Sequence, residues 1–288
     1  MEAPTDLKND FSKTRKNGIT IHHFQQFQSV FLDRSFKVDV YLPPDYDASN
    51  GNGRHPLLFF NDGQDMPGVQ LTQTLHRLYL EEKIPSIIVV AIHAADRLQE
   101  YGTAGQPDYK GRGSKAGRYA KFISHELIPY VWVHYHCSQN PSDTAFGGFS
   151  LGGLSALDIV WNHPNLFHKA GVFSGALWWR HTEFLDDDPD AHRIMHEIIE
   201  TEDHRPGLQF WLQTGTMDEK EDRNNNGIID AIDDTLDLIK VLKNTGYADQ
   251  EIVYREVDGG IHHPSTWGLV LPEFLEWCFG KQEVKSEK

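Results

Sequence analysis

The sequence predicts an α/β fold with a mostly parallel central sheet and helices on both faces, for three reasons. The chain of 288 residues is 39% hydrophobic and 11% aromatic, which is enough to bury a substantial core. Short, nearly continuous apolar runs recur along it, as expected of strands that are buried on both faces. Helical segments alternate with these runs, and this alternation is typical of parallel strands joined by crossover helices.

The first strands are expected to differ from the later ones. Residues 28–43, QSVFLDRSFKVDVYLP, have alternating apolar positions about a turn at 33–35, which predicts an antiparallel edge hairpin. Buried strands are then expected in HPLLFFND, SIIVVAIH, TAFGGFS, KAGVFSG, LQFWLQTG and EIVYREV. The intervening helices are expected over residues 117–135, 154–162 and 233–243.

No repeat, linker or low-complexity tract divides the chain, so we expect one domain over residues 1–288. Two connections are unusually long, at residues 96–115 and 176–207, and the second has the pattern of a helix within it. Long loops on such a sheet tend to lie over its functional edge, although a solvated excursion explains them equally well.

The charge and the N-terminal residues limit which partners and which cellular compartment are expected. A formal charge of -15 disfavours nucleic acid and anionic membranes, because their phosphates would be repelled. The N-terminal residues lack the apolar core of a secretory signal, so a cytoplasmic location is expected, or a periplasmic or secreted one if a leader was removed. Cys137 and Cys278 are expected to be buried free thiols. The oligomeric state is left open.

The motif GGFSLGG at residues 147–153 carries the first chemical signal. It contains G-x-S-x-G centred on Ser150, after a strand-like segment and before a helix-like one. In the nucleophile elbow, a serine on a tight strand-to-helix turn projects its hydroxyl outward while glycines let strand and helix approach closely. A glycine-rich turn without chemistry is the plainer alternative.

A serine nucleophile needs a base, and the base needs an orienting acid. DGGIHHPSTW follows the last apolar strand, and by position either His262 or His263 would serve as the base. LQFWLQTGTMD ends its strand with Asp218, where an orienting carboxylate belongs. The other candidates for the acid are Glu219, Glu221 and Asp258.

The developing negative charge on the substrate oxygen requires two backbone N–H groups. One is expected from Leu151, directly after the serine, and the other from Gln64 in LLFFNDGQDM, after an earlier strand. No cofactor is expected for this chemistry.

These motifs together give the chain a family resemblance. GGFSLGGLSAL, HPNLFHKAGVFSGALWW, QTGTMDE and GGIHHPSTWGLVLPEFLEW, in that order, resemble an esterase family of the α/β-hydrolases. That family includes esterase D, feruloyl and acetylxylan esterases, enterochelin esterases and mycolyltransferases. The resemblance implies the α/β-hydrolase fold, with Ser150 as nucleophile, Asp218 as acid and His262, five residues before Trp267, as base. It also implies that Gln64 is the second oxyanion donor, whereas Ile261 between Gly-Gly and the histidines departs from several members.

Residues 222–233, DRNNNGIIDAID, match the EF-hand calcium loop at every position except the last, where aspartate replaces glutamate. The expected ligands of a structural Ca²⁺ are Asp222, Asn224, Asn226, the Ile228 carbonyl, Asp230 and Asp233. A surface turn whose aspartates cap the next helix is the alternative.

The sequence therefore predicts a serine esterase that hydrolyses small-molecule or carbohydrate esters through an acyl-enzyme. An acyltransferase of the same family and a calcium-stabilised binding module without catalysis are the alternatives. Trp178, Arg97 and Tyr101 are the candidates for substrate contacts, and packing or a surface ion pair is the alternative for each.

Overall fold

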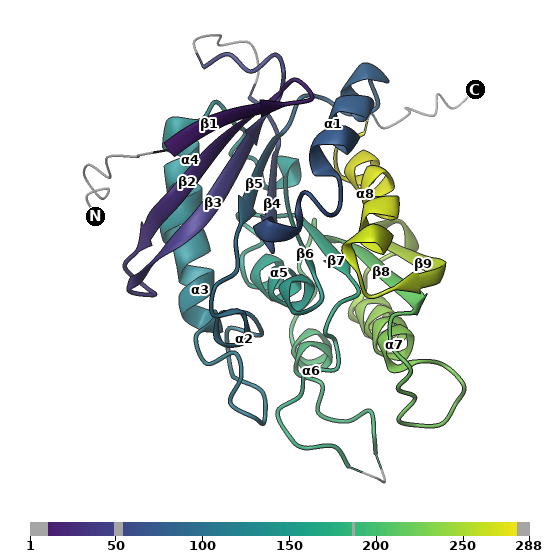
Figure 1. Cartoon of the computed structure of the whole chain (residues 1–288). Coiled ribbons are helices and arrows are strands. Elements are labelled where there is room, and N and C mark those ends of the chain that lie inside the picture. Colours follow the sequence, from purple (N-terminus) through teal and green to yellow (C-terminus); the bar gives the residue numbers. More distant parts are fainter. Residues whose placement is uncertain (1–10, 49–53, 186–187, 281–288) are drawn as a thin grey trace.

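The computed structural model describes residues 11–48, 54–185 and 188–280, and a mixed sheet organises them (Figure 1). In this described part the sheet has nine strands in the order β1-β2-β3-β5-β4-β6-β7-β8-β9. The pairings of β1 with β2, β2 with β3 and β3 with β5 are antiparallel, and all others are parallel. The strands are β1 (Phe11–Lys16), β2 (Ile19–Ser29), β3 (Arg34–Leu42), β4 (Leu57–Asn61), β5 (Ile88–Ile92), β6 (Thr144–Phe149), β7 (Lys169–Phe173), β8 (Gln209–Met217) and β9 (Ile252–Ile261). The predicted α/β class and its antiparallel start are confirmed.

The N-terminal strands differ in detail from the prediction. The hairpin turn precedes residue 34 instead of occupying 33–35, and β2 begins at Ile19, well before the predicted strand. Strand β3 is also not an edge strand, because it pairs with β5, and β1 forms the edge. Five of the six residues of β1 are exposed, so this strand carries no apolar alternation from which it could be predicted.

Helices cover both faces of the sheet, and side-chain alternation along the buried strands assigns them. Leu57 and Phe59 of β4 pack in one core cluster, whereas Leu58 and Phe60 pack in the other. The first cluster includes residues of α3, α4, α5, α6 and α7, and the second includes residues of α1 and α8. The helices are α1 (Leu71–Leu80), α2 (Arg97–Glu100), α3 (Ala116–Phe122), α4 (Ile128–His134), α5 (Leu151–Asn162), α6 (Ile194–Thr201), α7 (Asp230–Thr245) and α8 (Pro264–Phe279).

The three predicted helices are present with small differences in length. Residues 117–135 form α3 and α4, which are joined by a wider π-helical turn at Ile123–Leu127, and residues 154–162 lie in α5. The helix predicted at 233–243 is α7, which begins at Asp230. Cys137 and Cys278 are both buried and free. Among the described residues, no helix combines the length and the apolar character that crossing a bilayer would require.

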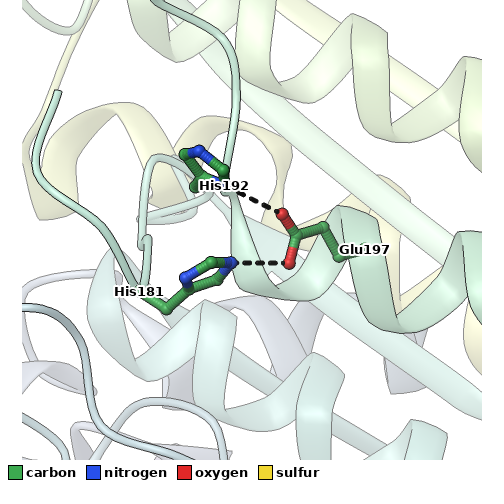
Figure 2. Close-up of side chains that lie close together, drawn as sticks. All are labelled: His181, His192 and Glu197. Carbon is green, nitrogen blue, oxygen red and sulfur yellow. Dashed lines mark hydrogen bonds and ion pairs between the residues drawn. The ribbon is translucent and has the colours of Figure 1, made fainter. Parts of the chain in front are cut away.

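Two parts of the long connection between β7 and α6 pair with each other. Arg180 and Arg193 pair as an antiparallel bridge, and the amide of His181 donates to the carbonyl of His192 over 3.1 Å. The side chains of His181 and His192 both face the carboxylate of Glu197 in α6, one at each of its oxygens (Figure 2). The predicted helix within residues 176–207 is α6.

Candidate active site

Ser150 occupies a strained turn between β6 and α5. Its backbone angles are φ 54° and ψ -123°, which a side chain-bearing residue rarely adopts. The turn is tied to the neighbouring strand, since the Ser150 amide donates to the Phe173 carbonyl over 2.8 Å and the Ala176 amide donates to the Ser150 carbonyl over 3.1 Å. A conformation of this cost persists only where its surroundings hold it, and here both flanking peptide groups are held.

The glycines of the motif are required by close approach. A Cβ atom on Gly148 would lie 2.2 Å from the carbonyl oxygen of Gly152, so strand and helix could not meet. A Cβ atom on Gly152 would lie 2.3 Å from Oδ2 of Asp62. The motif therefore has the steric properties of a nucleophile elbow.

Asp62 anchors the loop after β4 beside this turn, a role that the sequence analysis missed. The residue is fully buried with a left-handed backbone (φ 59°). Arg97 binds its carboxylate through two hydrogen bonds of 2.9 and 3.1 Å and also donates to the Phe149 carbonyl over 3.0 Å. The guanidinium thereby joins the loop that carries Gln64 to the residue before Ser150.

The two predicted oxyanion donors have free amides. Within the described residues, the amide groups of Gln64 and Leu151 have no hydrogen-bond acceptor. The Gln64 side chain is fixed on both sides, because it donates to Asp62 over 3.0 Å and accepts from the Ala94 amide over 3.0 Å. Leu151 is the first residue of α5, where amides are unsatisfied and the helix dipole is positive.

Two of the predicted substrate contacts lie behind this loop. Tyr101 is 1% exposed, and its hydroxyl accepts a hydrogen bond from the Asp62 amide over 3.1 Å. Its position supports the loop and leaves no surface for a ligand. Arg97 is partly exposed but is engaged with Asp62. Trp178 is half-buried beside Arg112, whose guanidinium lies 5.0 Å from the Trp178 ring centroid.

Asp218 follows the end of β8 with one carboxylate oxygen engaged and one unpartnered. Oδ2 accepts from the Gly215 amide over 2.9 Å, whereas Oδ1 is buried and has no hydrogen-bond partner among the described residues. Glu219 faces a different environment, because burial and the carboxylates of Asp230 and Asp234 raise its pKa to about 7. Asp258 is exposed.

His262 lies beside Asp218 at the end of β9. Loss of hydration lowers the pKa of His262, the nearby Asp218 carboxylate opposes this effect, and Arg97 adds to it. The imidazole packs edge-on against Trp267, with ring centroids 5.4 Å apart. Trp267 in turn stacks on Phe149, the residue before the nucleophile, at 4.5 Å. The ring of His262 is thus linked through Trp267 to Phe149, the residue before Ser150.

His263, unlike His262, caps a helix. It is the N-cap of α8, and its Nδ1 accepts from the Ser265 amide over 3.2 Å. A side-chain acceptor at this position satisfies one of the amides that a helix N-terminus leaves free. Position in the sequence does not distinguish the two adjacent histidines, but this capping contact does.

The structure gathers Ser150, Gln64, Leu151, Asp218 and His262 around the carboxyl ends of β4, β6, β8 and β9. No hydrogen bond joins Ser150, Asp218 and His262 directly in the part of the chain that the structure describes. The catalytic roles predicted for them stay predictions at this point.

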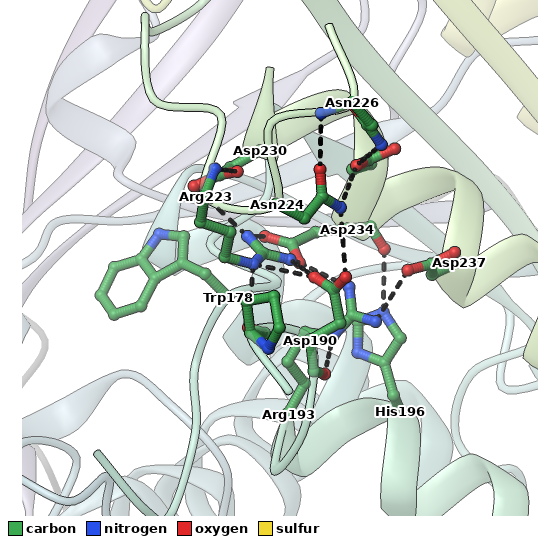
Figure 3. A network of polar contacts seen from close by, with 12 residues as sticks. Trp178, Asp190, Arg193, His196, Arg223, Asn224, Asn226, Asp230, Asp234 and Asp237 are labelled. Carbon is green, nitrogen blue, oxygen red and sulfur yellow. Dashed lines mark hydrogen bonds and ion pairs between the residues drawn. The ribbon is translucent and has the colours of Figure 1, made fainter. Parts of the chain in front are cut away.

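The predicted calcium loop folds around its own side chains (Figure 3). The carboxylate of Asp222 accepts from the amides of Asn226 and Gly227, over 3.0 and 2.9 Å. The side-chain amides of Asn224 and Asn226 both donate to Oδ2 of Asp233. Four of the predicted ligands therefore converge, whereas Asp230 accepts from the Arg223 amide over 2.9 Å and Ile228 donates to Asn226 over 2.8 Å.

Comparison with known proteins shows to which family the chain belongs. The family model described as Putative esterase matches residues 29–278. The chain belongs to this esterase family of the α/β-hydrolases. The chain is 23% identical over 247 residues to the Uncharacterized protein YbbA of Bacillus subtilis (strain 168), covering 84% of this chain and 92% of that protein. It is 26% identical to the Iron(III) enterobactin esterase of Escherichia coli (strain K12), covering 84% of this chain and 53% of that protein.

Solved structures agree in fold. The enterobactin esterase FES from Shigella flexneri superposes with a TM-score of 0.67 at 21% identity, covering 96% of this chain and 60% of that one. A ferulic acid esterase gives 0.66 at 16% identity, covering 94% of this chain and 98% of that one. An S-formylglutathione hydrolase from Agrobacterium tumefaciens gives 0.65 at 14% identity, covering 93% and 97%. The chain spans about 60% of the Shigella enzyme's length, so the whole activity of that enzyme is not carried over with the fold.

Proposed function

We propose that the protein is a serine esterase that hydrolyses carboxylic esters through an acyl-enzyme intermediate. The observation that carries the proposal is the strained Ser150 turn, together with two amides that have no acceptor of their own among the described residues, those of Leu151 and Gln64. A substrate carbonyl oxygen placed between these amides would have its developing charge stabilised while the serine attacks the carbon.

In the proposed reaction, His262 accepts the Ser150 hydroxyl proton as Oγ bonds to the ester carbonyl carbon. The tetrahedral intermediate collapses, the bond to the alcohol oxygen breaks, and His262 gives its proton to that oxygen. Water then attacks the acyl-enzyme with His262 again as base and releases the acid. The buried, unpartnered Oδ1 of Asp218 supports an orienting role, since a His262 N–H would be its natural donor.

The lowered pKa of His262 supports its assignment as the base. A histidine with a pKa below its ordinary value of 6.5 is neutral at pH 7 and ready to accept a proton. The capping contact of His263 argues against that residue, because its Nδ1 lone pair is already used.

The proposal is tested by hydrolysis of short p-nitrophenyl esters by the wild type and by Ser150→Ala, His262→Ala and His263→Ala. We expect Ser150→Ala and His262→Ala to lose at least about 10³-fold in kcat, and His263→Ala to retain most activity with a lower melting temperature. Equal activity of wild type and Ser150→Ala would end the proposal. A loss in His263→Ala equal to that in His262→Ala would reverse the choice of base.

For the substrate class we propose esters with an aromatic acyl group. The half-buried Trp178 ring supports this, and two structural neighbours are named for enterobactin and ferulic acid. Competition between feruloyl and acetyl esters of the same alcohol tests it, with Trp178→Ala expected to lose the preference for feruloyl. An unchanged preference would contradict it. Added alcohols in the same assay would reveal transfer of the acyl group in place of hydrolysis.

We also propose that the loop at residues 222–233 binds a structural Ca²⁺. The loop spacing and the convergence of Asp222, Asn224, Asn226 and Asp233 support the proposal. Calorimetric titration of the full chain with Ca²⁺ should show one site, and calcium should raise the melting temperature of the wild type but not of Asp222→Ala. No heat and no shift at millimolar calcium would refute it.

A further inference from the structure

Three metal-ligating side chains meet outside the residues assigned to ester hydrolysis (Figure 2). Nε2 of His181 lies 2.9 Å from Oε2 of Glu197, and Nδ1 of His192 lies 3.6 Å from Oε1 of the same carboxylate. One ligand atom from each residue fits within a mutual distance of 4.8 Å. Among the residues that the structure describes, no other group of three histidine, cysteine, aspartate or glutamate side chains does so.

The backbone holds these three residues together independently of their side chains. The His181 amide donates to the His192 carbonyl over 3.1 Å, and the Ile194 amide donates to the Trp179 carbonyl over 2.8 Å. His192 has a left-handed backbone (φ 67°), which is costly for a residue other than glycine. Glu197 follows within the first turn of α6. An ion would therefore meet ligands whose positions are largely fixed in advance.

The donor types select the class of ion. Two imidazole nitrogens and one carboxylate oxygen suit Zn²⁺ and the neighbouring divalent transition metals, whereas Ca²⁺ requires six to eight oxygen ligands. Two histidines and one glutamate leave a fourth tetrahedral position for water. The three side chains are 32%, 34% and 42% exposed, so solvent and a dissolved ion can reach them.

A neighbouring hydroxyl favours the required form of His181. Oγ1 of Thr182 lies 2.9 Å from Nδ1 of His181. If Nδ1 carries the proton and donates to this hydroxyl, the Nε2 lone pair faces Glu197 and is available to a metal ion. Outer partners of this kind orient the imidazole and fix its tautomer in known metal sites. A bound ion would take the place of the contact between Nε2 of His181 and Glu197, so any proton on Nε2 must leave when the ion binds.

We propose that His181, His192 and Glu197 bind one divalent transition-metal ion of the zinc class, with water completing the coordination. The ion ties residues 181 and 192 to α6 and stabilises the long connection between β7 and α6. This proposal does not depend on the esterase activity.

The chain offers a matched control in His23, Asp39 and His93. His23 and His93 bind different oxygens of Asp39 over 2.6 and 2.9 Å, as the other two histidines do with Glu197. The second ring nitrogen of His23 is occupied by the Thr14 hydroxyl over 2.7 Å. His23→Ala thus removes a paired histidine without touching the proposed ligands.

The test uses the full chain without an added histidine tag, freed of metal by a chelator, dialysed and saturated with calcium. Zn²⁺ is titrated by calorimetry and Co²⁺ by visible absorption, for wild type, His181→Ala, Glu197→Gln and His23→Ala. We expect one Zn²⁺ per chain in the wild type and in His23→Ala, and affinity weakened about 100-fold or more in the other two. Zn²⁺ should also raise the melting temperature of the wild type but not of Glu197→Gln.

Absence of Zn²⁺ binding by the wild type would overturn the proposal. So would equal affinity in Glu197→Gln and wild type, or an equal loss in His23→Ala and His181→Ala, since either result places the ion elsewhere. Circular dichroism on each variant establishes that it is folded, and Glu197→Gln retains an oxygen acceptor for His181 should His181→Ala fail to fold.

Discussion

Two polar regions of this esterase are built in opposite ways. Around Ser150, the proposed catalytic region holds backbone in costly left-handed conformations and leaves one oxygen of Asp218 without a partner among the described residues. Between α6 and α7, the polar network of Asp190, Arg193, Arg223, Asp234 and Asp237 pairs each charge with an opposite one (Figure 3).

The difference shows how the chain separates chemistry from stability. In the proposed function, the unpaired donors and acceptors of the catalytic region serve a substrate and the histidine, and the cost of leaving them unpaired falls on folding. In the polar network, the side chains of Arg223 and Arg193 are each 8% exposed. Their ion pairs hold together the long connection between β7 and α6, the loop at residues 222–233, and the helices α6 and α7. Damage to the first region should reduce the rate, and damage to the second should reduce stability.

The largest expected effect is on the rate, from Asp218→Asn. The asparagine can still accept from the Gly215 amide but cannot orient His262 as a carboxylate does. We expect kcat to fall about 10⁴-fold with the melting temperature nearly unchanged. The matched control is Asp258→Asn at an exposed position of β9. A fall of less than tenfold for Asp218→Asn would move the acid to another residue.

Next in size is Arg223→Met, which leaves two carboxylates of the polar network without this cation. Removing one partner of a buried ion pair costs about 3–5 kcal/mol of unfolding free energy. We expect a loss of this size by urea denaturation, with kcat retained in the folded protein. Arg255→Met is the control, because Arg255 and Glu273 are both 48% exposed and such pairs contribute about 1 kcal/mol or less. Equal losses in both variants would remove the proposed contrast.

Gly152→Ala should affect the catalytic region more than overall stability. The added Cβ would lie 2.3 Å from Oδ2 of Asp62, so that carboxylate must move, and with it the Gln64 side chain that donates to Oδ1. Displacements near 1 Å can cost about 100-fold in rate, and we expect kcat/KM to fall by this amount. Gly105→Ala is the control, since its Cβ would have no atom within 4 Å. An active Gly152→Ala would show that the loop after β4 tolerates movement.

The last prediction concerns the pH dependence of stability and Asp158, a buried carboxylate of α5. Burial raises its pKa from 3.8 to about 7, although Ala104 and Asn162 donate to it. A group with a raised folded-state pKa contributes stability that is present below its unfolded pKa and lost as pH rises through the folded value. Between pH 4 and 7 the wild type should therefore lose up to about 1.4 kcal/mol per pH unit relative to Asp158→Asn. Parallel stability curves for the two proteins would contradict this.

Much of the fold was predictable because buried strands and crossover helices leave plain patterns. Strand β1 was not, since its exposed residues FSKTRK carry no apolar alternation. The turn motif predicted Ser150 as the nucleophile because the glycines of such a turn are required by steric contacts between residues close in sequence, as the distance between Gly148 and Gly152 shows.

Residues that act through distant contacts escaped sequence reasoning. Arg97 and Tyr101 were predicted as substrate contacts, yet both form hydrogen bonds with Asp62. The role of Asp62 depends on the fold, which brings residues 62, 97 and 149 together. The cluster of His181, His192 and Glu197 has no metal-binding spacing in the sequence, because a backbone bridge between residues 180 and 193 creates it. His262 and His263 are equivalent by position, and the structure separates them because His263 caps α8 whereas His262 packs against Trp267.

The central claim is that Ser150 is a nucleophile activated by its surroundings. Its most direct test is covalent labelling by a fluorophosphonate, followed by intact mass measurement and peptide mapping. We predict one adduct per chain on Ser150, none in Ser150→Ala, and much slower labelling in His262→Ala. A folded wild-type protein that forms no adduct, or forms it on another residue, would contradict the account.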